Sequence, residues 1–145
     1  MKHTLTALIL SIGLTASIPA LADLSTTAPE SSSVATMTLS ELQAAAQAGN
    51  VRAQFYLANR YKLGQGVQQD YEQAFNWFKN AALQGAAPAQ LNLGQMYAEG
   101  KGVDADMDQA KLWLGKAAKQ GDNRASYNLA LLEERSKNLA NAYQW

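Results

Sequence analysis

Apolar residues recur at helical spacing through the central part of the chain. Ala53, Leu57 and Tyr61 are each four residues apart, which places them on one face of an expected first helix. A second apolar stripe follows after a break rich in glycine and consists of Ala74, Trp77 or Phe78, Ala81 and Ala82. The pattern therefore predicts two helices joined by a short loop.

The ends of both expected helices carry residues suited to helix termini. Gly64 and Gly66 follow the first stripe, and glycine adopts the positive φ angles that helix ends and tight turns need. Asp70 can cap the second helix, and Gln73 is placed three residues later, where its side chain can reach back. Gly85 is expected to end the second helix.

The same two-helix unit occurs twice in the sequence, at an offset of 36 residues. Between residues 64–85 and residues 100–121, eleven of the 22 aligned positions are identical. Asp106 and Gln109 repeat the expected cap, and Asn50, Pro88 and Asp122 suit the starts of the three first helices. Self-similarity at a fixed period is typical of stacked supersecondary units, each of which packs on the next.

Both ends of the array depart from the repeat. Residues 38–50 keep only a remnant of a second helix. The third copy has Glu133 in place of the tyrosine and lacks the glycine turn, although Ala142 and Trp145 match Ala74 and Trp77 if four loop residues are deleted. We therefore expect two full repeats, 51–86 and 87–122, between a degenerate half-repeat, 38–50, and a truncated repeat, 123–145.

The repeated pattern resembles the Sel1-like repeat, a relative of the tetratricopeptide repeat, and the resemblance covers Ser40 to the end of the chain. In the first copy it is carried by Leu57, Ala58, Tyr61, Gly64, Gly66, Val67, Asp70, Ala74, Trp77, Ala81, Ala82 and Gly85. The second copy carries it on Leu93, Gly94, Tyr97, Gly100, Gly102, Val103, Asp106, Ala110, Trp113, Ala117, Ala118 and Gly121. The resemblance implies an all-α fold, a short right-handed α-solenoid of antiparallel helix pairs.

Residues 1–22 have the pattern of a secretory signal peptide. Lys2 and His3 give a positive start, the following stretch is mostly apolar, and small residues precede Asp23 as at a cleavage site. The apolar stretch is short for a membrane anchor, so we expect cleavage, no stable membrane insertion afterwards, and a periplasmic or secreted protein. Residues 23–37 are rich in serine, threonine and proline and are expected to form a flexible linker.

Composition excludes several kinds of chemistry. The chain has no cysteine, and its one histidine, His3, would leave with the signal peptide, so triads built on histidine or cysteine and zinc or haem sites are not expected. Loss of Lys2 leaves 11 basic and 12 acidic residues. A charge near −1 gives no attraction to nucleic acid or anionic membrane. We expect no cofactor and no enzymatic activity.

Acidic residues cluster at two places, and both have a structural explanation. Asp104, Asp106 and Asp108 begin like a calcium loop, but Gln109 and Gly115 occupy the positions that need glycine and glutamate. A helix cap at Asp106 explains this cluster better. Glu133 and Glu134 are neighbours on one helix, so they do not face a common cleft and indicate a solvated surface. The two Gly-x-Gly loops lack the strand and third glycine of a nucleotide-binding loop.

On one face of the first helices, the positions recur at the same spacing in each copy of the repeat, but the residues at these positions differ between copies. This face contains Phe55, Leu91 and Tyr127, and by resemblance to tetratricopeptide arrays it lines the concave groove. An apolar strip with a polar rim suits the binding of a protein or peptide. Alternatively, these side chains pack against adjacent helices. The expected binding residues are Arg52, Phe55, Asn59, Lys62, Leu91, Gln95, Arg124, Tyr127 and Leu131.

The expected function is an exported protein–protein interaction module that acts as an adaptor or regulator in the bacterial envelope. Resemblance to small exported Sel1-like proteins leaves open an immunity protein that neutralises an exported toxin such as a lipase. A third hypothesis, a β-lactam-binding enzyme, follows from resemblance to cysteine-rich Sel1-like proteins. The absence of cysteine argues against it.

Overall fold

The structure, a computed structural model, describes residues 33–144. The expected signal peptide, residues 23–32 of the expected linker and Trp145 lie outside the described residues. The elements are a 3-10 turn, η3 (Val34–Thr36), and six α-helices: α1 (Leu39–Gln47), α2 (Val51–Leu63), α3 (Tyr71–Leu83), α4 (Ala87–Glu99), α5 (Met107–Lys119) and α6 (Asn123–Ala142). No strand occurs between residues 33 and 144.

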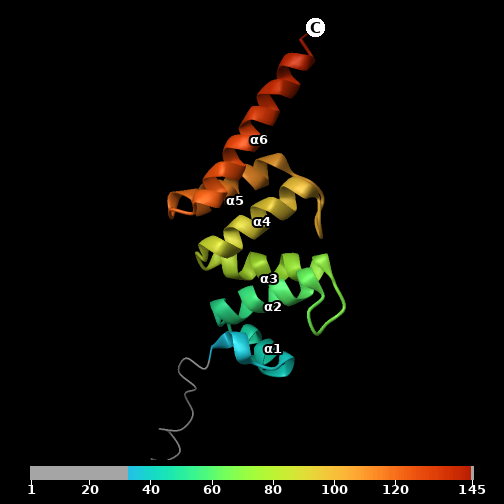
Figure 1. The fold of residues 1–145 in the computed structure, drawn as a ribbon, viewed down its shortest axis with the longest axis vertical. Helices are drawn as coiled ribbons and strands as arrows, with labels where there is room; N and C mark the ends of the chain where they lie inside the picture. The colour runs from blue at the N-terminus through green and yellow to red at the C-terminus, as the bar shows by residue number, and fades with distance from the viewer. Residues whose placement is uncertain (1–32, 145) are drawn as a thin grey trace, which may run out of the picture. The chain divides into compact units, whose positions relative to one another are not determined.

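Each helix packs against the next one in the chain. Contacts join α1 to α2, α2 to α3, α3 to α4, α4 to α5, and α5 to α6. Figure 1 shows the same succession, from α1 at one end of the stack to α6 at the other. The expected all-α stack of helix pairs is confirmed, with α2 and α3 in the first repeat and α4 and α5 in the second.

The expected helix caps form at the predicted residues. The Asp70 carboxylate accepts a hydrogen bond from the Gln73 backbone N–H at 3.0 Å, and Asp106 accepts the equivalent bond from Gln109 at 3.0 Å. These bonds satisfy N–H groups that the first helical turn leaves without partners. The expected return bond from the Gln73 side chain does not form. The reciprocal capping box occurs instead at Thr38 and Glu41, at the start of α1.

Two glycines of the second loop are required by its geometry. Gly100 ends α4 in the left-handed conformation, at φ 66°, which residues with a Cβ rarely adopt. Gly102 has φ 73°, and a Cβ built on it would overlap the backbone carbonyl of Tyr71. The loop of the second repeat therefore lies directly against the start of α3.

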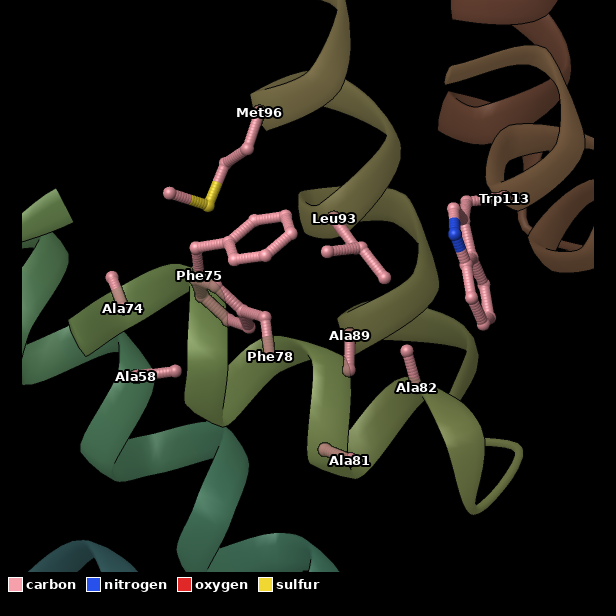
Figure 2. Close-up of a cluster of buried hydrophobic side chains, with 10 residues drawn as sticks. All are labelled: Ala58, Ala74, Phe75, Phe78, Ala81, Ala82, Ala89, Leu93, Met96 and Trp113. Atoms are coloured by element: carbon pink, nitrogen blue, oxygen red, sulfur yellow. The ribbon is translucent and has the colours of Figure 1, made fainter. Parts of the chain in front are cut away.

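The largest buried cluster is formed by α2, α3, α4 and α5. Figure 2 shows Phe78 and Leu93 at its centre, with Trp113 approaching from α5. The sequence left open whether Trp77 or Phe78 belongs to the core. Phe78 is fully buried and Trp77 is half-buried, whereas Trp113 is only 6% exposed. The equivalent tryptophans of the two repeats are therefore buried to different extents.

Buried glutamines connect neighbouring helix pairs. Gln54 and Gln90, each 5% exposed, occupy equivalent positions on α2 and α4. The Gln54 amide donates to the Ala46 carbonyl at 3.1 Å and accepts from the Gln84 amide at 2.8 Å. Gln90 repeats both bonds, donating to Ala82 at 3.2 Å and accepting from Gln120 at 2.8 Å. Each buried glutamine therefore joins the helix before it to the helix after it.

The packed domain begins earlier than the sequence indicated. Val34, which we assigned to the flexible linker, is buried in a cluster with Leu42 and Leu57. The guanidinium of Arg60 also donates to the Met37 carbonyl at 2.9 Å. The linker prediction is therefore wrong for residues 34–37, because one apolar side chain and one backbone hydrogen bond tie this segment to α2.

The truncated third repeat forms one long helix. The interpretation of Ala142 as part of a second helix is wrong, because α6 continues without a break from Asn123 to Ala142. Ser136 stands where Gly64 and Gly100 end the first helices of the other repeats. Serine does not favour the left-handed conformation that Gly64 and Gly100 adopt, and the helix continues through this position, where the Ser136 hydroxyl donates to the Leu132 carbonyl at 2.8 Å. Within residues 33–144, no helix combines the length and hydropathy needed to cross a bilayer.

We expect Trp113→Ala to lower the free energy of unfolding by about 3–5 kcal/mol, because it removes a buried indole and leaves a cavity. A small domain is stabilised by only about 5–15 kcal/mol in total. Thermal and denaturant unfolding of the purified variant measure this loss. Trp77→Ala is the matched control, since it removes the same side chain at a half-buried repeat position and should cost less. Equal losses in the two variants would contradict the assignment of Trp113 to the core.

Candidate functional site

The expected binding residues all lie on α2, α4 and α6, the first helices of the three repeats. The structure does not place them on one uniform surface. They fall into an apolar group, which varies in exposure along the stack, and a polar group, of which several members are already hydrogen-bonded. The apolar group consists of Phe55, Leu91, Tyr127 and Leu131. The polar group consists of Arg52, Asn59, Lys62, Gln95 and Arg124.

Phe55 is half-buried on α2. Its ring meets the ring of Phe78 edge-on, with centroids 5.8 Å apart, and lies 5.9 Å from the ring of Tyr56. Such edge-to-face pairs add to the stabilisation that burial gives. Phe55 thus packs against α3 on one side while part of its ring stays accessible.

Leu91 does not contribute to an exposed ridge. It is 3% exposed and belongs to a buried cluster with Leu114 of α5 and Ala125 of α6. The alternative interpretation, packing against adjacent helices, is correct at this position. The physical reason is that α6 follows α4 in the stack and covers the face from which Leu91 projects.

Tyr127 and Leu131 form the exposed part of the apolar group. They are 65% and 45% exposed, and they lie four residues apart on α6. Tyr127 occupies the repeat position of Leu91, but α6 is the last helix of the described chain, so no further helix covers it. A large aromatic side chain at a stacking position is therefore accessible to another molecule.

The polar residues near the middle of the stack are held by neighbours. The Lys62 ammonium donates to the side-chain oxygen of Asn92 at 2.8 Å and so bridges α2 and α4. Burial lowers the pKa of Lys62 from its usual value, with a smaller opposing effect from the nearby Glu99 carboxylate. The Asn59 amide donates to the Phe55 carbonyl at 3.0 Å. Lys62 and Asn59 therefore support the surface as well as line it.

The two arginines of the predicted surface differ in their partners. Arg52 is exposed at the start of α2 and lines a cleft there. Arg124 forms an ion pair with Asp122 at 3.0 Å, and this hydrogen bond lowers the pKa of the Asp122 carboxyl. Asp122 also accepts from backbone N–H groups at the start of α6. Arg124 is thus engaged by the helix cap of its own helix.

Three clefts mark this side of the stack. One, of about 380 Å³, lies between α2 and the start of α4 and is lined by Val51, Arg52, Phe55, Ala86 and Pro88. A polar one, of about 300 Å³, is lined by Lys62, Leu63, Gln69, Tyr71, Gln95, Met96, Glu99 and Lys101. The third, of about 270 Å³, lies between α4, α5 and α6 and is lined by Gln95, Ala98, Glu99, Leu114, Asn128, Leu131, Leu132 and Arg135.

Several lining residues were not among the sequence-predicted site residues. Arg135, one turn beyond Leu131 on α6, and Asn128 line the third cleft. Asn92, the equivalent of Asn128 on α4, lines none of the three clefts and bonds to Lys62. The offset of 36 residues relates Asn92 to Asn128, so the repeat contained a signal for this pair. Nothing in the sequence pattern alone indicated that Lys62 would bond to Asn92.

The described residues offer no arrangement for metal binding. No group of three histidine, cysteine, aspartate or glutamate side chains in residues 33–144 could hold a metal ion. Asp106 acts as the cap of α5, as the sequence indicated, and Glu133 and Glu134 are both exposed on α6. The chemistry available on this surface is apolar contact, amide hydrogen bonding and charge pairing, which is the chemistry of molecular recognition.

Comparison with protein families identifies both complete helix pairs. The family model described as Sel1 repeat matches residues 51–85 and 87–122, which contain α2 with α3 and α4 with α5. A search of curated proteins finds no match to the chain.

Solved structures share the fold. The chain is similar to a Sel1 repeat protein from Oxalobacter formigenes, with 42% identity over 61% of this chain and 67% of that chain and a TM-score of 0.60. It is similar to a protective antigen of uropathogenic Escherichia coli strains that displays an SLR fold, with 45% identity over 58% of this chain and 18% of that one and a TM-score of 0.57. Cysteine-rich protein B of Helicobacter pylori is 26% identical over 61% of this chain and 66% of that chain, with a TM-score of 0.58.

The two lines of comparison agree with the stack of helix pairs seen in the structure. Because the family model matches both complete pairs and the solved structures share their fold, the chain belongs to the Sel1 repeat family of protein–protein interaction modules.

Proposed function

We propose that this chain is an exported adaptor or regulator that binds another protein in the bacterial envelope. Sel1 repeats are a non-enzymatic scaffold for protein interaction, which gives the class of function. The observation that carries the proposal is the exposed apolar pair Tyr127 and Leu131 at a position where the preceding repeat buries Leu91. Aromatic side chains in such places are common anchors of protein interfaces.

The position of this pair favours a protein partner over a small ligand. Tyr127 and Leu131 lie on the same helix as Arg135, and Leu131 and Arg135 line the cleft shared with α4 and α5. An apolar centre beside polar and charged groups matches the anatomy of a protein interface. The cleft near Phe55 and Arg52 offers a second contact area of the same kind on the first repeat.

Export is supported by the sequence of the first 22 residues, with its positive start, apolar stretch and small residues before Asp23. The complete absence of cysteine is compatible with an oxidising compartment, because the fold makes no use of disulfides. On this proposal the protein acts in the periplasm or outside the cell, and the repeats are the part that meets the partner.

The function is tested by affinity capture from envelope extract after brief cross-linking, with the partner then purified for direct binding measurements. We expect Tyr127→Ala and Phe55→Ala each to weaken binding to the purified partner by more than about 1 kcal/mol, as loss of an interface anchor does. Tyr127→Ala should leave the melting temperature nearly unchanged, because the side chain is mostly exposed.

Leu91→Ala serves as the matched control for this surface. It alters the same repeat position, but there the side chain is buried, so it should lower the melting temperature clearly. A Tyr127 variant that unfolds as easily as the Leu91 variant would show that Tyr127 is core. Normal melting and normal partner binding in both the Tyr127 and Phe55 variants would place the partner on another face.

Export has a separate prediction. Intact-mass measurement of protein recovered from the periplasmic fraction should give the mass of a chain that begins at Asp23, because a signal peptidase cuts after the small residues. Recovery of a chain that retains the first 22 residues, or recovery from the cytoplasm alone, would refute the export part of the proposal. Neither result would affect the assignment of the binding surface.

A further inference from the structure

Of the eight residues that line the cleft between α4, α5 and α6, only Asn128 is identical to its equivalent at the earlier repeat junction, and at two positions a much larger side chain is replaced. Leu114 takes the repeat position of Phe78, and Ala98 takes the position of Lys62. Both substitutions remove atoms, and both Leu114 and Ala98 line the cleft. At the earlier junction Lys62 lines the corresponding cleft, and the buried Phe78 ring does not.

The loss of the lysine also changes the hydrogen bonding. At the earlier junction the Lys62 ammonium donates to the Asn92 side-chain oxygen at 2.8 Å and so links α2 to α4. Asn128 is the equivalent of Asn92, but Ala98 has no group that can bond to it. The Asn128 amide therefore lines the cleft between α4, α5 and α6 without the lysine bond that Asn92 receives.

The charges at the rim of the cleft do not balance. Glu99 forms an ion pair with Lys101 at 2.8 Å, which neutralises the one carboxylate of the lining. Arg135 forms no ion pair with another residue between 33 and 144. The cleft thus combines an apolar floor of Leu114, Leu131 and Leu132 with a guanidinium that has no acidic partner among residues 33–144.

We propose that this cleft holds one bulky apolar side chain of the protein partner, and that an acidic side chain next to it in the partner's sequence pairs with Arg135. The inference rests on the proposed function and names the chemistry that this surface recognises. The volume of about 270 Å³ is below the range of about 300–1,000 Å³ typical of small-molecule pockets, and suits a single side chain. The Gln95 and Asn128 amides can bond to the peptide backbone on either side of it.

The test uses a blocked peptide as the probe, acetyl-Gly-Ser-Phe-Asp-Ser-Gly-amide, titrated into the isotopically labelled full-length protein. We expect saturable shifts of the side-chain amide resonances of Gln95 and Asn128. Peptides with alanine in place of phenylalanine, or lysine in place of aspartate, should bind at least fivefold more weakly. Absence of saturable shifts with the first peptide, or equal affinity for all three, overturns the proposal.

Two variants fill the cleft with the side chains that the earlier repeat uses. Leu114→Phe and Ala98→Lys should each weaken peptide binding at least tenfold, and either one suffices if the other does not fold. Arg135→Ala should remove the preference for aspartate over lysine, whereas Arg124→Ala, which removes an arginine already paired to Asp122, should retain it. Unchanged binding in a folded cleft-filling variant overturns the assignment.

The peptide experiment tests the cleft assignment, and the envelope capture tests the proposed function, so each can fail without the other. If capture yields a partner and the peptide gives no saturable shift, the proposed function stands and the cleft assignment is wrong. If the peptide binds as described and capture yields no partner, the cleft assignment stands and the proposed adaptor function is wrong.

Discussion

The register of α2 and α4 on their neighbours depends on a buried glutamine at each of two boundaries between helix pairs, α1–α2 and α3–α4. Gln90 of α4 donates to the carbonyl end of α3 and accepts from Gln120, which lies just after the end of α5. A buried amide left without these partners would cost free energy, so the bonds favour one register of α4 on its neighbours. Gln54 does the same for α2. This register decides which side chains of α2 and α4 point outwards.

One helical face of the first helices carries different residues in each repeat. Whether a side chain on this face is exposed depends on whether later helices cover it. This face holds Phe55, Leu91 and Tyr127. Leu91 is buried because α5 and α6 cover it, and Tyr127 is exposed because α6 is the last helix of the described chain. A position that is buried inside the stack at Leu91 is thus accessible on α6, where we propose that a partner binds.

The sequence predicted the helices well because each helix-forming pattern and each cap occurs in both full repeats. Both full repeats and the caps Asp70 and Asp106 were expected, since a polar residue before an apolar stripe is a local feature. The burial of Leu91 was not predictable from the phase of one helix, because it depends on helices distant in sequence. Val34 was missed for the same reason: its own segment resembles a linker, and only contact with α2 makes it core.

The claim that the buried glutamines couple neighbouring helices is tested most directly by a double-mutant cycle on Gln90 of α4 and Gln120 at the end of α5. The cycle compares unfolding free energies of Gln90→Met, Gln120→Ala, the double variant and the parent. Since the two side chains share a bond of 2.8 Å, we predict a coupling of about 0.5–1.5 kcal/mol, the usual net contribution of such a bond. Losses that add with no coupling beyond experimental error would contradict the claim.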